Sequence, residues 1–88
     1  MIIYNVLFKG VEKRITPICV AFATEEEARD YIETRIEASE ELTLKSTLGW
    51  SNNIDDYRLE DKEENSYYFV IYRQEMKINT DTLLEIIN

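Results

Sequence analysis

The chain of 88 residues has room for one domain with one hydrophobic core, and no change in composition marks a second domain. Its 44% hydrophobic and 11% aromatic residues, with only two Gly and one Pro, exclude a disordered or low-complexity segment. The net charge of −8 disfavours direct binding to nucleic acids and to anionic membranes, because both are negatively charged. No apolar run approaches the roughly 20 residues of a membrane helix, and no signal-peptide pattern is present, so we expect a cytoplasmic protein.

Two apolar runs at the start of the chain predict a β-hairpin. The first, Ile2 to Phe8, is rich in β-branched and aromatic residues, and the second extends from Ile15 to Phe22. Pro17 has no amide hydrogen for a ladder bond, so it belongs near the start of a strand or on an edge strand.

A helix is expected to begin after Thr24, because Thr24 to Glu27 forms a capping box. In such a box the Thr24 hydroxyl accepts the amide of Glu27, and the Glu27 carboxylate reaches back to the amide of Thr24. The apolar residues that follow share an arc of about 160°. They are Ala28, Tyr31, Ile32, Ile36, Ala38 and Leu42. Arg35 and Ser39 interrupt this arc, so the far end of the helix should be half-buried.

The second half of the chain predicts two more strands and a short helix. Residues 43–56 lack a sustained period and carry turn formers, which indicates a long loop or a short strand between loops. Tyr57 to Glu60 alternates like a half-exposed strand, and Ser66 to Ile78 begins with apolar residues on both faces, as a central strand does. Asn79 or Thr80 can cap a terminal helix.

We therefore expect one α+β domain over residues 1–88, with the element order ββαββα. An antiparallel sheet of about four strands would carry the long helix on one face. The short C-terminal helix could cover part of the other face.

The residues needed for common catalytic and metal sites are missing. There is no His and only one Cys, the acidic runs lack calcium-loop spacing, and Gly10 and Gly49 are isolated rather than part of a phosphate-binding loop. Cys19 lies between apolar neighbours, which predicts a small buried side chain rather than a reactive thiol. We expect no metal, no cofactor and no enzymatic activity. A carboxylate-based enzyme or small-ligand binder is the remaining alternative, and it would need a deep pocket.

Negative charge is concentrated in the middle of the chain. Residues 24–64 hold fourteen acids and five bases, a net charge of −9. One face of the predicted helix, about 100° wide, gathers six carboxylates. They are Glu26, Asp30, Glu33, Glu37, Glu40 and Glu41. Along about 22 Å of helix these would give one charge per roughly 3.7 Å, close to the roughly 3.4 Å per charge of a DNA strand. Few Lys residues compensate these carboxylates at i+4, which favours a functional acidic face. The alternative interpretation is an ordinary helix face exposed to solvent.

Aromatic residues are the second unusual feature. The chain has six Tyr and one Trp, with Tyr67, Tyr68 and Tyr72 in one predicted strand and Trp50 in the predicted loop. Such residues are enriched at protein interfaces, although they also fill the core and rim of small sheets.

The segment from Val20 to Ile32, a strand leading through a Thr cap into an acidic helix, resembles the same junction in small phage and mobile-element proteins. Some of these are anti-defence inhibitors such as anti-CRISPR proteins. The resemblance covers thirteen residues and carries over no functional residue.

These observations favour a non-enzymatic protein that occludes a basic, nucleic-acid-binding site on a partner protein, such as a CRISPR nuclease. The resemblance implies a phage-encoded inhibitor. We expect the helix carboxylates, further acids of the second half and Trp50 or an exposed Tyr to contact the partner. The further acids are Asp55, Asp56, Glu60, Asp61, Glu63 and Glu64. The alternative is a small homodimeric accessory domain whose acids serve only solubility.

Overall fold

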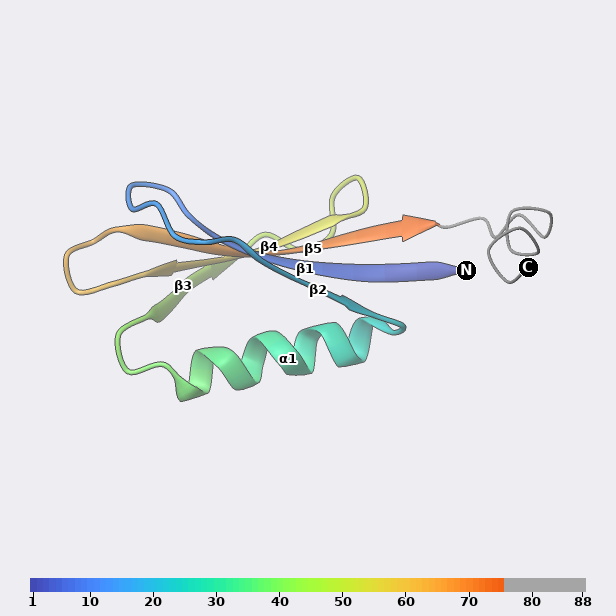
Figure 1. Ribbon diagram of the computed structural model, residues 1–88, viewed down its shortest axis with the longest axis horizontal. Helices are drawn as coiled ribbons and strands as arrows, with labels where there is room; N and C mark the ends of the chain where they lie inside the picture. Colours follow the sequence, from blue (N-terminus) through green and yellow to red (C-terminus); the bar gives the residue numbers. More distant parts are fainter. Residues whose placement is uncertain (76–88) are drawn as a thin grey trace, which may run out of the picture.

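The computed structural model describes residues 1–75, which form one five-stranded antiparallel sheet with a helix on one face (Figure 1). The elements are β1 Ile2–Gly10, β2 Ile18–Phe22, α1 Glu25–Ala38, β3 Thr43–Thr47, β4 Ile54–Glu60 and β5 Ser66–Glu75. The strands lie in the order β2-β1-β5-β4-β3, so β5 is central, as its apolar character on both faces predicts. The predicted C-terminal helix lies outside the described residues.

The α+β class and the antiparallel sheet are confirmed, but the expected number of about four strands is wrong. Of the two alternatives for residues 43–56, the strand is observed: Thr43–Thr47 pairs with β4 at the edge of the sheet. The chain reverses direction between β3 and β4 at Asn52 and Asn53, whose positive φ angles of 49° and 67° match a two-residue hairpin turn. The fold over residues 1–75 is therefore ββαβββ.

The predicted strands and the long helix are observed, but β4 begins at Ile54 rather than at Tyr57, and the second strand begins later than Ile15. β2 begins at Ile18, directly after Pro17, because proline cannot donate to the ladder. Thr24 caps α1, and its Oγ1 accepts the Glu27 amide at 3.2 Å. The other half of the capping box differs, since the Glu27 carboxylate accepts the Thr24 hydroxyl at 3.0 Å.

The core lies between α1 and the sheet. Ala28 and Ile32 of the helix are fully buried against strand residues that alternate along the sheet. These strand residues are Val6, Tyr57, Leu59, Tyr67, Phe69 and Ile71. Among the described elements, α1 packs mainly on β1 and β2, so it leaves β3 at the opposite edge less covered.

The other face of the sheet carries no described helix, and it corrects the expectation for Cys19. Cys19 pairs with Leu7, and both side chains lie on the face opposite α1, where Cys19 is exposed rather than buried. Tyr68 and Tyr72 of β5 lie on this open face. Val70 lies between them on the same face, but it is buried because neighbouring strands flank it on both sides.

Replacing Gly10 with Ala is expected to destabilise the fold by about 1–3 kcal/mol. A Cβ atom there would lie 2.3 Å from the Lys13 carbonyl oxygen, so backbone in the β1–β2 connection would have to move. Urea denaturation followed by circular dichroism measures the change. The matched control is Gly49→Ala, which meets no atom within 4 Å and bears only the strain of its φ of +76°. If Gly10→Ala lowers the free energy of unfolding less than Gly49→Ala does, the predicted clash with the Lys13 carbonyl oxygen is wrong.

Candidate functional site

Four of the predicted carboxylates form a continuous stripe along the exposed side of α1. Glu26, Asp30, Glu33 and Glu37 follow one another at spacings of four, three and four residues, which places them on one helix face. All four are exposed, and none forms a salt bridge within residues 1–75. We call these four residues the acidic stripe.

Glu40 and Glu41 are exposed but do not extend the stripe, because the helix ends at Ala38 and Ser39 is its C-cap. The expectation of six carboxylates on one helix is therefore wrong. At about 1.5 Å per residue, the four remaining charges over roughly 16.5 Å give one charge per about 4.1 Å. Their linear density is lower than that of a DNA strand, so charge spacing alone no longer argues for DNA mimicry.

Arg29 links the helix to the β3–β4 region. Its Nη2 donates to Asp55 Oδ2 at 2.6 Å, its Nε donates to Glu25 Oε1 at 2.9 Å, and its Nη1 donates to the Tyr57 hydroxyl. Burial disfavours the guanidinium charge, but the hydrogen bonds to the two carboxylates outweigh it and raise the pKa of Arg29. Burial also raises the pKa of the Tyr57 hydroxyl. Arg29 is thus held charged against a buried acid.

Asp55 and Trp50, both predicted to contact a partner, instead form hydrogen bonds with other residues of this chain. Asp55 is only 1% exposed, so it is not a surface charge. Trp50 is half-buried, and its Nε1 donates to Glu25 Oε1 at 2.7 Å, which lowers the pKa of Glu25 together with the bond from Arg29. The guanidinium carbons of Arg29 and Arg73 lie 5.5 Å and 5.0 Å from the Trp50 ring.

A hollow of about 440 Å³ opens between the acidic stripe and β3. It lies on the same face of the sheet as α1, where the helix packs mainly on β1 and β2 and leaves β3 at the opposite edge less covered. The side chains that bound it include Arg29, Glu33, Glu37, Leu44, Thr47 and Asp55. Two carboxylates of the stripe thus stand at the rim of a concave surface.

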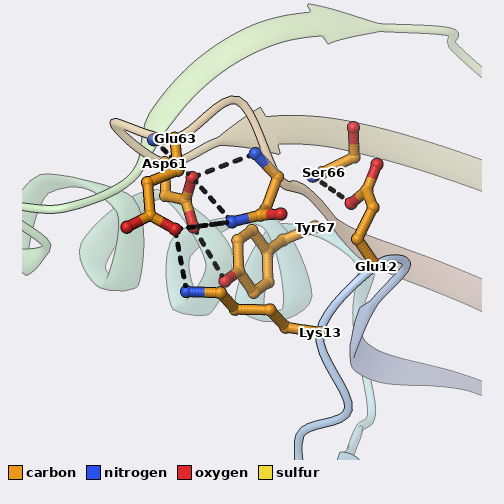
Figure 2. A network of polar contacts seen from close by, with 7 residues as sticks. Glu12, Lys13, Asp61, Glu63, Ser66 and Tyr67 are labelled. Atoms are coloured by element: carbon orange, nitrogen blue, oxygen red, sulfur yellow. Dashed lines mark hydrogen bonds and ion pairs between the residues drawn. The ribbon is translucent and has the colours of Figure 1, made fainter.

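Asp61 and Glu63 belong to a separate network at the β4–β5 turn (Figure 2). Asp61 Oδ1 accepts the backbone amides of Glu63 and Asn65 at 2.9 Å and 3.0 Å, and Oδ2 accepts the Asn65 side chain and the Tyr67 hydroxyl, both at 3.0 Å. The bond from the Asn65 side chain is the largest cause that lowers the pKa of Asp61 to about 2. Glu63 pairs with Lys13 at 3.4 Å. These two acids stabilise a turn.

Replacing Asp61 with Asn is expected to lower the free energy of unfolding at neutral pH, with a pH dependence of known sign. The folded-state pKa is about 2, below the ordinary value of 3.8. Asp61 therefore stabilises the fold above the ordinary pKa, and this contribution is lost as the pH falls toward 2. Urea midpoints of wild type and Asp61→Asn should differ most near pH 6 and converge near pH 2. The exposed Glu64→Gln is the control; a difference that persists unchanged at low pH would contradict the assignment.

The remaining predicted acids are scattered. Asp56 and Glu60 lie on the open face of the sheet, away from the acidic stripe, and Glu60 pairs with Arg58 at 3.0 Å. Glu64 is exposed in the β4–β5 turn. Sequence reasoning missed the role of Arg29. The i,i+4 spacing of Glu25 and Arg29 was an available signal, whereas the pairing of Arg29 with Asp55 depends on the tertiary fold.

Comparisons with known proteins add no relative. No protein-family model matches the sequence, and neither the curated proteins nor the solved structures contain a match. The resemblance of residues 20–32 to phage proteins stays a prediction. Within residues 1–75, no helix has the length and apolar character to cross a membrane, and no three acidic or Cys side chains converge on a metal-binding position.

Proposed function

We propose that this chain is a cytoplasmic, non-enzymatic binding protein that occludes a basic site on a partner protein. The acidic stripe supports this function best, because its four exposed carboxylates form no salt bridge within the described residues. An ordinary solvated helix intersperses both signs of charge, since like charges at i,i+4 destabilise it. Clustered Lys and Arg occur where proteins bind nucleic acid, so the partner is a nucleic-acid-handling enzyme, and a defence nuclease of the CRISPR type fits the predicted phage origin.

A pull-down from a nuclease-treated bacterial lysate that contains such a nuclease tests the proposal. The triple variant Glu26→Lys, Glu33→Lys and Glu37→Lys, which reverses three charges of the acidic stripe, is expected to slow association with the captured enzyme by about tenfold or more at low salt, because steering by opposite charges is lost. High salt should release the enzyme from the unsubstituted protein. The control replaces the same three residues with Asp, which keeps the charge. Capture that neither salt nor charge reversal weakens would refute the proposal.

A second candidate function, a homodimeric accessory domain, is favoured by the open face of the sheet. Ile54 and Tyr72 are 37% and 36% exposed there, beside the exposed Cys19. A second copy could bury these side chains. Light scattering distinguishes the two functions, since a stable dimer that is insensitive to the stripe reversals supports the accessory domain.

A further inference from the structure

The hollow between the acidic stripe and β3 has features of a binding site for a positively charged side chain. Glu33 and Glu37 stand at its rim on successive turns of α1, and Leu44 and Ile36 supply apolar wall. Its volume of about 440 Å³ falls within the roughly 300–1,000 Å³ of pockets that hold small ligands. It is therefore large enough for one long side chain.

The buried Asp55 adds a further negative charge in the wall of the hollow. Only its Oδ2 is bonded, to Arg29, while Oδ1 is buried without a hydrogen-bond partner among the described residues. A buried acceptor without a donor is rare in folded proteins, and Asp55 forms part of the wall of the hollow. Arg29 balances Asp55, so Glu33 and Glu37 leave the lining with two uncompensated negative charges.

We propose that the hollow receives an arginine side chain of the partner protein. Arginine fits better than lysine, because its planar fork offers five donors and can bond a carboxylate in bidentate fashion, as Glu33 and Glu37 at the rim allow. Its aliphatic stem packs against Leu44 and Ile36, as long cationic side chains do on apolar surface. This inference rests on the proposed function and names the group of the partner that the site recognises.

An NMR titration with the peptide acetyl-Gly-Arg-Gly-amide tests the site without the partner. Saturable amide shifts are expected at Leu44, Thr47 and Gly49, and the same peptide with neutral citrulline in place of arginine should leave them unchanged. The double variant E33Q/E37Q should abolish the shifts, whereas E26Q/D30N, which removes the same charge from the stripe outside the hollow, should retain them. No saturable shift, or equal loss in both double variants, overturns the proposal.

A second pair of variants separates this site from the proposed function. Thr47→Lys places an ammonium group in the hollow and is expected to weaken binding to the captured partner about tenfold, since it takes the place of the arginine. Thr34→Lys makes the same change on α1 outside the hollow and should have a much smaller effect. Equal effects of the two variants, with binding still abolished by reversal of the stripe, overturn the arginine site and leave the proposed function intact. Binding that ignores the reversal overturns the proposed function itself.

Discussion

Replacing Arg29 with Met is expected to destabilise the fold by about 3 kcal/mol, near the lower end of the cost of breaking a buried ion pair. The substitution leaves Asp55, which is 1% exposed, as an uncompensated buried charge. The lower end applies because the Arg29 side chain is 31% exposed, so water screens part of the interaction. Urea denaturation monitored by circular dichroism measures the loss. Trp50 fluorescence is a second probe, because the ring lies beside the removed guanidinium.

The double variant Arg29→Met with Asp55→Asn is the control for this explanation. Asparagine has nearly the same shape as aspartate without its charge, so the double variant should recover much of the stability lost in Arg29→Met. Full additivity of the two single substitutions would show that the ion pair does not set the cost. A loss below about 0.5 kcal/mol in Arg29→Met would contradict the pairing itself.

Two groups of acids within residues 1–75 differ in their partners. Glu25, Asp55 and Asp61 each accept two or more hydrogen bonds or an ion pair and stabilise the fold. The acidic stripe has no such partner in the described part of the chain. Reversing a bonded acid therefore tests stability, whereas reversing the stripe tests recognition. This separation makes the stripe suitable for binding experiments on a folded protein.

Local chemistry accounts for what the sequence predicted correctly. The Thr24 cap, the place of Pro17 near the start of an edge strand and the apolar faces of β5 each depend on neighbours within a few residues. The strand Thr43–Thr47 was harder to assign, because all five of its residues are exposed and no alternation of burial marks it. Its pairing with β4 decides its conformation.

Positions set by tertiary contacts were the ones that the sequence misplaced. Cys19 has apolar neighbours, but which face of the sheet it occupies depends on its register with β1. Asp55 carries the same charge as its neighbour Asp56, yet alternation turns Asp55 toward Arg29 and Asp56 toward the open face. An acidic pair in a sequence therefore does not reveal which member is a surface charge.

Replacing Ile32 with Ala is expected to destabilise the fold by about 2–5 kcal/mol, since the substitution removes a fully buried side chain and leaves a cavity. Ile32 is at the centre of the contact between α1 and the sheet, so the helix that carries the acidic stripe should detach first. The loss is comparable with the roughly 4–13 kcal/mol expected for the stability of a domain of this size. Thermal and urea denaturation measure it.

Two matched variants separate packing from helix propensity in this test. Ile32→Val keeps most of the side chain and should cost only about 0.5–1.5 kcal/mol. Thr34→Ala, on the exposed side of the same helix, makes a similar gain in helix propensity and should change stability by about 0.5 kcal/mol or less. If Ile32→Ala costs no more than Ile32→Val, the helix does not depend on this contact. The acidic stripe would then be held in place by the capping box and by Arg29, which anchors the first half of α1 to Asp55.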